Sequence, residues 1–455
     1  MTAGTGGADV VVVGAGMAGL VAALQAQLLG ARVVLVEKGD EPGGSLALSG
    51  GTLWCARTHE DLLRLVPRGD PELGGVLVSD FDEGVAWLRE NGATVTLLPS
   101  EPHRKVYWLE PGPREFVRKM VERFEAAGGT LMLRSQGWKL LMDSDGSLSG
   151  IVVRAAGGLQ TFRTRAVILT TGGFQANPEM RARYFGQWAD RLVLRSNPNS
   201  TGDGWQMASA AGAASSRAMS SFYGHLLPAP PAKVPVNDFI AYTMYHSEQS
   251  LLVNLRGERF TDESLGDETN AQAVARQPDA LGFLLFDDAV YRQFAVRTNL
   301  TGARASYTFF ESKSLGAPAA TAQTVEELAT AMQGWGLYGP GVVETVRQFN
   351  AAAASGTCAH LRVLRRAKAH ALTQPPYYAL GVTPGITFTL GGLRINTDAH
   401  VLDSAGRPIA GLYAAGADAG GIHNEQYAGG LCLGLVFGRR AACFAARQTR
   451  PKQDL

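Results

Sequence analysis

The stretch VVVVGAGMAGLVAALQAQLLGARVVLVEK, from Val10 to Lys38, decides the fold. It opens with four consecutive valines, a run typical of a buried parallel strand. A G-x-G-x-x-G pattern follows directly, then a helical stretch that ends at Gly30 and a second apolar run. Glu37 closes that run, where dinucleotide-binding folds place an acid for the ribose hydroxyls. The order of these parts predicts a strand–helix–strand unit that binds a dinucleotide at the helix N-terminus.

The same stretch is apolar enough to raise the alternative of a membrane span. A spanning helix needs roughly 20 apolar residues without helix breakers or charges. Three glycines interrupt the first third of this stretch, and Gln25, Gln27 and Arg32 follow them. The residues before Val10 carry no positive charge, which a signal peptide would need. We therefore expect neither a membrane span nor a signal peptide.

Composition narrows the classes of protein further. The chain has 455 residues, which favours two domains over one, and 45% of them are hydrophobic. The net charge of +1 gives no electrostatic reason to expect nucleic acid or an anionic membrane as partner. The four cysteines lie far apart without a C-x-x-C pair, and the histidines show no ligand spacing. We expect no metal site and a reducing, cytoplasmic location.

Further glycine-rich turns indicate FAD rather than NAD as the dinucleotide. GDEPGGSLALSGG, Gly39 to Gly51, offers backbone N–H groups and small hydroxyls to a pyrophosphate or a flavin edge. Two later apolar runs also lead into glycine turns, in TRAVILTTGGF at Thr164–Phe174 and in GLYAAGADAGG at Gly411–Gly421. Such additional turns suit a cofactor that has two ends to hold, and no second NADH-type fingerprint is present.

Together these motifs resemble the flavoprotein family of fumarate reductase and succinate dehydrogenase, which includes 3-ketosteroid and tricarballylate dehydrogenases. NSTGDGWQMASAAGA, NLRGERFTDES and TFTLGGLRIN complete the set in the family's order. The resemblance implies an α/β protein whose Rossmann-like FAD-binding domain, of the glutathione reductase type, is interrupted by an inserted capping domain. Two Pro-rich crossings suggest the boundaries. We predict the FAD-binding domain at 1–222 and 366–455 and the cap at 223–365.

The glycine turns and the resemblance together assign the cofactor site. Some flavoproteins of this broad family attach FAD covalently through a His just after the GG loop, where this chain has Ser45, Leu46 and Ala47. We therefore expect non-covalent FAD. The predicted cofactor-binding residues are Gly14, Gly16, Met17, Ala18, Gly19, Glu37, Lys38, Gly43, Gly44, Ser45, Ser49, Gly50, Gly51, Thr171, Gly172, Gly173, Asp203, Gly416, Ala417, Asp418, Leu431 and Leu433.

The resemblance also implies where the substrate carbonyl is held. HNEQYAGGLCLG, His423 to Gly434, is similar to the Tyr-Pro-Gly turn of the ketosteroid branch, with Ala428 in place of Pro. Tyr427 and the N–H of Leu431 match the groups that hold the ketone oxygen there, and a phenol and an amide can stabilise an enolate. The fumarate reductase branch carries arginines where Gly266 or Asp267 and Tyr427 stand, and a His where Phe388 stands. His423 matches that branch, but reduction of a C4 dicarboxylate by its arginine acid is not expected.

The base that takes the substrate proton is less defined by the sequence. Past RFTDES the ketosteroid branch has a catalytic Tyr roughly where Asp267 falls, so Asp267 or Glu268 could abstract a proton. Tyr242, Tyr245 and His246 are other cap residues that could line the cleft. For each of these an exposed acid or a core aromatic is the simpler interpretation. Arg259 and Glu263 are interpreted as a structural or interface pair.

These observations lead to an FAD-dependent dehydrogenase that introduces a C=C bond α,β to a carbonyl in a small, cyclic ketone or an oxo-carboxylate. One alternative is oxidation of a polycarboxylate as in tricarballylate dehydrogenase, or the reverse enoate reduction, with Arg394, Arg183 or Arg191 as carboxylate contacts. Another is a flavin-binding electron-transfer subunit without a substrate of its own. The sequence leaves the electron acceptor open between a quinone, a redox protein and oxygen.

Overall fold

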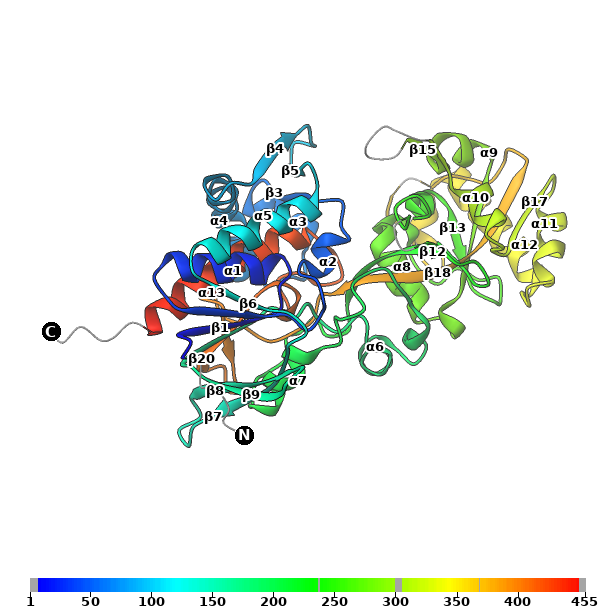
Figure 1. The fold of residues 1–455 in the computed structure, drawn as a ribbon. Helices are drawn as coiled ribbons and strands as arrows, with labels where there is room; N and C mark the ends of the chain where they lie inside the picture. The colour runs from blue at the N-terminus through cyan, green and yellow to red at the C-terminus, as the bar shows by residue number, and fades with distance from the viewer. Residues whose placement is uncertain (1–6, 236–237, 299–304, 368, 450–455) are drawn as a thin grey trace. The chain divides into compact units, whose positions relative to one another are not determined.

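The computed structural model describes residues 7–235, 238–298, 305–367 and 369–449, and the chain divides into two compact units. Unit 1 comprises Met1–Asn177, Ser196–Phe222 and Phe388–Leu455. Unit 2 comprises Pro178–Arg195 and Tyr223–Thr387. The chain therefore leaves unit 1 and returns to it more than once (Figure 1).

Unit 1 is built on a largely parallel sheet with the strand order β19-β20-β10-β1-β2-β6. The central strand β1 (Val10–Val13) pairs in parallel with β2 (Val33–Val36) on one side and β10 (Ala166–Leu169) on the other. β6 (Thr130–Met132) and β20 (Pro408–Ala414) extend the parallel set, and β19 (His400–Leu402) pairs antiparallel with β20. All four residues of β1 are buried, as its unbroken valine run predicts.

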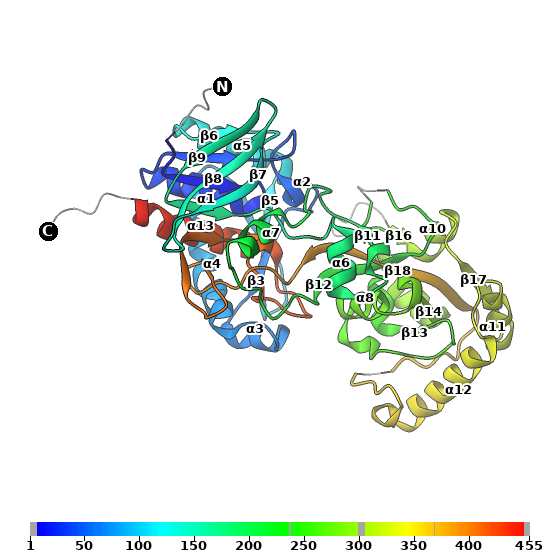
Figure 2. The same ribbon diagram turned by 90° about the horizontal axis from the view of Figure 1, so that it is seen from below.

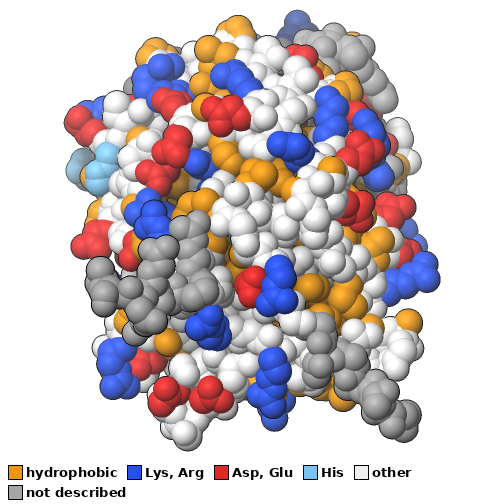
Figure 3. Space-filling model, turned by 60° about the vertical axis from the view of Figure 1, so that its left-hand side comes forward, with side chains coloured by type: hydrophobic (Ala, Val, Ile, Leu, Met, Phe, Trp, Pro, Cys, Tyr) orange, Lys and Arg blue, Asp and Glu red, His pale blue; other side chains and the backbone are white. Residues whose placement is uncertain are grey.

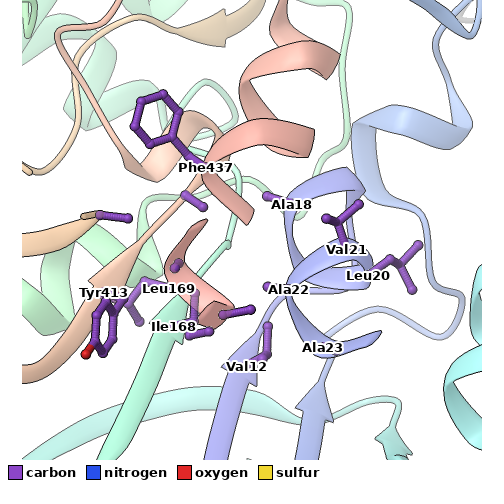
Figure 4. Close-up of a cluster of buried hydrophobic side chains, with 14 of the residues drawn as sticks. Val12, Ala18, Leu20, Val21, Ala22, Ala23, Ile168, Leu169, Tyr413 and Phe437 are labelled. Carbon is purple, nitrogen blue, oxygen red and sulfur yellow. The ribbon is translucent and has the colours of Figure 1, made fainter. Parts of the chain in front are cut away.

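Two helices cover one face of this sheet and come from opposite ends of the chain. α1 (Met17–Leu28) follows β1, and α13 (Gly430–Thr449) ends the described chain. Figure 1 shows them running side by side above the sheet. Apolar side chains from both helices and the strands beneath meet in one core, where Val12, Val21, Ile168 and Phe437 are drawn in Figure 4. This packing fixes the N-terminus of each helix over the carboxyl end of the sheet.

Smaller elements complete unit 1. The curved sheet β7-β8-β9 lies on the side of the main sheet away from α1 (Figure 2), and β3-β5-β4 forms another antiparallel sheet. The remaining elements are α2 (Gly44–Ala47), β3 (Thr52–Ala56), α3 (His59–Leu65), α4 (Pro71–Glu90), β4 (Thr94–Leu98), β5 (Arg104–Glu110), α5 (Pro113–Ala126), β7 (Gln136–Met142), β8 (Leu148–Ala155), β9 (Gly158–Arg163) and α7 (Asp203–Ala210).

Unit 2 is organised around one long strand, β18 (Tyr377–Thr389). It pairs in parallel with β11 and antiparallel with β14 and β17, and β12 also joins it. The other elements are α6 (Pro178–Phe185), β11 (Val193–Leu194), β12 (Phe222–Pro228), β13 (Leu251–Val253), α8 (Asp267–Ala275), β14 (Gly282–Asp287), α9 (Asp288–Val290), β15 (Val296–Thr298), β16 (Ala305–Tyr307), α10 (Thr308–Ser314), β17 (Ala319–Ala322), α11 (Val325–Gln333) and α12 (Gly339–Ser355).

The observed division differs in two places from the boundaries expected of the sequence. The chain passes from unit 1 to unit 2 between Phe222 and Tyr223. Residues 178–195, however, belong to unit 2, because β11 pairs with β18. The return to unit 1 comes after Thr387 rather than at 366, because β18 must first cross the sheet of unit 2. The Pro-rich segment thus leads into a strand and not directly into the other unit.

The helices, the potential metal ligands and the surface charges bear on whether the chain has features of a membrane span, a metal site or a charged patch. Within the described residues, no helix combines the length and apolar character needed to cross a bilayer. The described part of the chain also holds no cluster of His, Cys, Asp and Glu suited to a metal ion. On the face drawn in Figure 3, acidic and basic side chains are interspersed rather than gathered by sign.

Candidate functional site

The glycines after β1 have three different surroundings, and these match three different roles. Gly14 has a φ of +104°, and a side chain there would meet the Thr170 carbonyl oxygen at 2.4 Å. A Cβ on Gly19 would lie 1.7 Å from the Gly14 carbonyl oxygen. A Cβ on Gly16 would meet only the Gly43 carbonyl oxygen, at 3.9 Å. Gly14 and Gly19 are therefore required by the turn and the packing, whereas the space beside Gly16 is open, as a bound pyrophosphate needs.

The start of α1 supplies donors to that open space. The first N–H groups of a helix, here those of Met17, Ala18 and Gly19, have no acceptor within the helix. The helix dipole places partial positive charge at the same end. The open space beside Gly16 and these donors fit a dinucleotide phosphate.

Glu37 lies at the carboxyl end of β2 and is buried. Its carboxylate accepts hydrogen bonds from the N–H of Ala15 at 2.8 Å and of Gly39 at 2.7 Å. A carboxylate offers about four lone-pair sites, so two further donors can still bind. The predicted ribose contact is thus compatible with a carboxylate that also holds the glycine turn in place.

Lys38 and Asp203 contact each other. Lys38 Nζ lies 3.0 Å from Asp203 Oδ2 and 2.7 Å from Thr201 Oγ1, and Gln136 Nε2 donates to the same Asp203 oxygen at 2.8 Å. This network joins the end of β2 to the start of α7. The sequence pattern assigned both residues to the cofactor, and the contacts that the structure records are among the protein's own side chains.

The GG loop forms the short helix α2. Gly43 N–H donates to the Ala15 carbonyl at 2.8 Å, which brings this loop against the G-x-G-x-x-G turn. Gly44, the first residue of α2, also lies near the turn, because a Cβ there would be 3.7 Å from the Gly16 Cα. Ser45 Oγ lies 2.8 Å from Ser196 Oγ, and Ser49 Oγ accepts from the N–H of Gly51 at 3.1 Å. The loop thus brings Gly44 and Ser45 beside the cradle, while Ser49, Gly50 and Gly51 lead away from it into β3.

The other two glycine turns meet at Asp418. Asp418 accepts hydrogen bonds from the N–H and hydroxyl of Thr171, and burial raises the pKa of this carboxyl to about 6. At Gly173 a Cβ would lie 2.4 Å from Thr389 Oγ1 and 2.9 Å from Gln175 Oε1. Both of these side-chain atoms are buried without a hydrogen-bond partner in the described part of the chain. Unpaired buried polar atoms are costly, so this corner fits a ligand with polar ring edges such as a flavin.

Tyr427 is surrounded by aromatic rings. The ring centroids of Trp54, Phe388 and His423 lie 5.3, 5.7 and 5.7 Å from that of Tyr427. The Tyr427 hydroxyl oxygen accepts a hydrogen bond from the N–H of Gly430 at 2.9 Å, and a hydroxyl polarised in this way is a stronger donor. Gly429 and Gly430 are needed for close packing on Trp54 and Phe388, where a Cβ would clash or crowd. The expected approach of this pair to the cofactor stays a prediction.

His423 is uncharged at neutral pH because burial lowers the pKa of its imidazole to about 4. Its Nε2 atom is buried and has no hydrogen-bond partner within the described residues. Leu431 and Leu433 lie in the first turn of α13, whose N–H groups lack acceptors inside the helix. Unit 1 therefore brings three of the predicted catalytic residues, Tyr427, His423 and Leu431, into one neighbourhood.

The other two predicted catalytic residues meet in unit 2. Asp267 is buried rather than exposed, and its carboxylate is hydrogen-bonded to Nδ1 of His225. The ring of Tyr245 lies edge-on to that of His225, with centroids 5.4 Å apart. Burial raises the pKa of Asp267 to about 8 and lowers that of His225 to about 3. Asp267 and Tyr245 thus share a buried cluster whose members were not all expected.

Sequence reasoning missed His225 and Tyr223 in this cluster and Trp54 beside Tyr427. Tyr223 and His225 are two positions apart on β12 and so share a face of the strand, which is the one local signal they carry. The arginines considered for carboxylate contacts include Arg183 and Arg191, which are exposed and paired with Glu179 and Asp279.

Known proteins confirm the resemblance. A family profile described as "FAD binding domain" matches residues 9–433. A probable fumarate reductase of Shewanella frigidimarina is 30% identical over 98% of this chain and 76% of its own length. The vinyl phenol reductase of Lactiplantibacillus plantarum is 29% identical over 97% of both chains. The solved 3-ketosteroid-delta4-(5alpha)-dehydrogenase of Rhodococcus jostii shares the fold, with a TM-score of 0.73 and 24% identity over 96% of both chains. The chain belongs to the FAD-binding domain family and is an FAD-dependent oxidoreductase.

Proposed function

We propose that this oxidoreductase dehydrogenates the α,β carbon–carbon bond of a cyclic ketone or another carbonyl compound with an apolar body. The observation that carries the proposal is the aromatic surround of Tyr427, made by Trp54, Phe388 and His423. An enone offers a flat face to such rings, and a cyclic ketone and an enone each offer one oxygen to a phenol. In the related fumarate reductase branch, cationic side chains are expected at the positions of Phe388 and Tyr427.

FAD, when bound, supplies an acceptor or donor of hydride and so carries the two-electron part of the chemistry. The open space at Gly16, the N–H groups of α1 and Glu37 would hold its dinucleotide part. Gln175, Thr389 and the first turn of α13 would hold the polar edges of its ring system. We take the attachment to be non-covalent, because Ser45, Leu46 and Ala47 offer no His. Acid precipitation checks this, since only a covalent flavin precipitates with the protein.

Tyr427 orients and polarises the substrate. Its hydroxyl would donate to the carbonyl oxygen, and the N–H of Leu431 would donate to the same oxygen. As a proton leaves the neighbouring carbon, negative charge develops on this oxygen and both bonds strengthen. His423 Nε2, a buried neutral nitrogen, offers a further hydrogen bond without adding charge. The proton itself needs an acid–base group, and Asp267 and Tyr245 are the candidates that the sequence offers.

Reduction of a conjugated double bond is the second candidate, and the relatives favour it. One relative is named a fumarate reductase and another a vinyl phenol reductase, and each aligns with almost the whole chain. The same residues serve both directions, because a group that takes a proton in one direction returns it in the other. The substrate of the second relative, by its name, is an aromatic vinyl compound, which fits a site lined by rings.

An anaerobic titration of the purified, FAD-loaded protein tests the proposal. Cyclic ketones should bleach the oxidised flavin band if the enzyme dehydrogenates, and enones or vinyl phenols should reoxidise dithionite-reduced protein if it reduces. Tyr427→Phe should slow the productive direction about 100-fold, because removal of one oxyanion donor typically costs that much. Tyr338→Phe, at an exposed tyrosine, serves as the matched control.

The remaining outcomes decide against the proposal. Response to polycarboxylates alone would move the substrate to the tricarballylate class. No response to any of these compounds, with normal photoreduction of the flavin, would leave an electron-transfer subunit without its own substrate.

A further measurement on the same protein identifies the electron acceptor. It compares how fast a quinone, a redox protein and oxygen each reoxidise the reduced flavin.

A further inference from the structure

A chain of hydrogen bonds runs from the half-buried Tyr223 into the interior of unit 2. The Tyr223 hydroxyl oxygen lies 2.9 Å from His225 Nε2, and His225 Nδ1 is hydrogen-bonded to Asp267 Oδ2. Tyr223 and His225 share one face of β12, and Asp267 is the first residue of α8; both elements are labelled in Figure 1. The side chains of His225 and Asp267 are 4% and 8% exposed. The three groups form a proton path with one end at a surface and the other in the core.

We propose that Tyr223 is a catalytic residue that exchanges the proton with the substrate, and that His225 and Asp267 are positioning residues that set its proton affinity. The inference rests on the proposed function, in which a carbon next to a carbonyl loses or gains a proton. In this inference Tyr223, rather than Asp267 or Tyr245, is the residue that touches the substrate.

The covalent chain ties Tyr223 to the turn that carries Tyr427. Ser221 Oγ lies 2.9 Å from Asn424 Oδ1, and Asn424 is three residues before Tyr427. Tyr223 follows Ser221 by two residues, so their Cα atoms are at most about 7 Å apart. This limit follows from the covalent chain alone, and it keeps Tyr223 close to Ser221, whose hydroxyl is hydrogen-bonded to Asn424 in the turn that carries Tyr427.

The buried end of this hydrogen-bond chain, at Asp267, is held in place by further hydrogen bonds. Leu226 N–H and Ser247 Oγ also hydrogen-bond the Asp267 carboxyl, the latter at 3.5 Å, and Asn270 Nδ2 donates to Ser247 Oγ at 3.2 Å. Side chains with so many partners hold one orientation. His225 is therefore fixed with one ring nitrogen toward Asp267 and the other toward Tyr223.

The protonation state of Asp267 decides whether the Tyr223 hydroxyl group donates a proton to the substrate or accepts one from it. Burial raises the pKa of Asp267 to about 8, so below that pH its carboxyl donates to His225 Nδ1. His225 Nε2 then donates to the Tyr223 oxygen, and the phenol proton is available to a substrate. Above pH 8 the carboxylate accepts from Nδ1, and Nε2 accepts the phenol proton, so the Tyr223 oxygen can take a proton from a substrate.

Charged groups on the surrounding elements also shift the pKa values of Asp267 and His225. Arg195, which follows β11, lowers the pKa of Asp267 and of His225. Glu248 raises the pKa of Asp267, and Glu268 raises that of His225. Burial raises the pKa of Tyr245, which packs on His225, so that phenol stays neutral. Burial outweighs these charges, and Asp267 remains the group that titrates.

The proton and electron balance is as follows. In dehydrogenation the α C–H bond breaks, and its proton passes to the Tyr223 oxygen as the phenol proton moves to His225 Nε2. The Asp267 carboxylate neutralises the resulting imidazolium. The electron pair left on the α carbon would form the new C=C bond as the β hydrogen leaves as hydride, and FAD, when bound, would supply the two-electron oxidant. In reduction each transfer runs backwards.

Turnover of the FAD-loaded full chain provides the first test. Tyr223→Phe should lower the rate about 100-fold or more, as loss of an acid–base group does. FAD content should be unchanged, and Tyr338→Phe should match the wild type. Asp267→Asn and His225→Gln should remove the wild-type limb near pH 8 from the pH–rate profile. A Tyr223→Phe enzyme within threefold of wild type, on a substrate that wild type turns over, would overturn the proposal.

A second measurement needs no substrate and so separates this inference from the proposed function. In protein labelled with ¹⁵N-histidine, His225 should change from the Nε2–H to the Nδ1–H tautomer as pH rises through about 8. The signal is assigned by its loss in His225→Gln, and Asp267→Asn should abolish the change. A constant tautomer between pH 6 and 10 would refute the relay even if the enzyme is active. An inactive wild type with the expected change would instead contradict the proposed substrate class.

Discussion

At the scale of single residues, Gly16 and Gly19 look alike in the sequence, but we expect alanine at these two positions to have opposite effects on stability and on FAD affinity. Gly19→Ala places a methyl group 1.7 Å from a backbone oxygen that packing holds in place. We expect a loss of about 3 kcal/mol in unfolding free energy, the upper range for overpacked cores. Gly16→Ala meets nothing closer than 3.9 Å, so the protein without cofactor should keep its stability.

For FAD affinity we expect the larger effect from Gly16→Ala, the variant with the smaller effect on stability. The methyl group of Gly16→Ala occupies the space where the pyrophosphate approaches, so we expect FAD to bind at least tenfold more weakly. Urea denaturation of the apoprotein and titration with FAD measure the two quantities separately. Equal FAD affinity in Gly16→Ala and wild type would mean that the pyrophosphate does not lie beside this residue.

At the scale of elements, glycines let α1 and α13 approach closely. A Cβ on Gly438 would lie 2.7 Å from the Ala18 carbonyl oxygen, and one on Gly434 would lie 3.1 Å from the Met17 side chain. Because Ala18 is in the first turn of α1, the closeness of the two helices also places the cradle. Elements from the two ends of the chain therefore build one cofactor site through a small-residue contact.

Gly438→Ala should cost about 1–3 kcal/mol in unfolding free energy, since neither helix backbone can move away from the sheet. Gly75 in α4 is the matched control, because a Cβ there would lie 3.7 Å from its nearest neighbour, the His59 ring. Gly75→Ala should stabilise by about 0.5–1 kcal/mol, as alanine does in open helix positions. Thermal melts of both variants measure the difference, and the same sign for both would contradict the close helix contact.

The strands of unit 2 explain why the domain boundaries were hard to predict. β18 is a long, mostly buried strand whose partners β11, β14 and β17 come from three distant segments. No local pattern shows that Val193–Leu194 pairs with residues near 385, because register depends on the whole sheet. Proline-rich composition marks a loop, but it does not show to which unit the next strand belongs.

At the scale of the whole molecule, unit 2 has its own buried ionic anchor. Glu263 is fully buried and accepts hydrogen bonds from Arg259 Nη2 at 2.5 Å and from Arg365 Nη1 at 3.2 Å. Both arginines are also nearly inaccessible, so the three side chains join a loop after β13 to the segment before β18. Arg259 and Glu263 thus form the structural pair that the sequence indicated, and Arg365 completes it.

Glu263→Ala would leave two arginines buried without their counter-ion, which typically costs about 3–5 kcal/mol. We expect calorimetry to show a lower transition for unit 2, and FAD to raise only the transition of unit 1. Glu344→Ala, which removes an exposed ion pair with Arg347, should leave both transitions unchanged. A single transition that shifts equally with FAD and with Glu263→Ala would show that the two units unfold together.

The parts of this protein that could be predicted from its sequence are those in which neighbouring residues define the geometry. The spacing of Gly14, Gly16 and Glu37 describes the cradle because a strand, a tight turn and a helix allow only one arrangement over so few residues. Gly429 and Gly430 beside Tyr427 are likewise adjacent in the sequence, and the role of their turn at the cofactor stays a prediction. The FAD-binding fold followed from these local motifs and their order along the chain.

Other parts depend on positions that are far apart in the chain. His225 and Asp267 are 42 residues apart, and Thr171 and Asp418 are 247 apart. Their contacts exist because β12, α8 and the glycine turns pack in one register, and the burial that shifts the pKa of Asp267 arises from that packing. A sequence can name a lone Asp, His or Tyr, but the folded chain determines which of them share a proton.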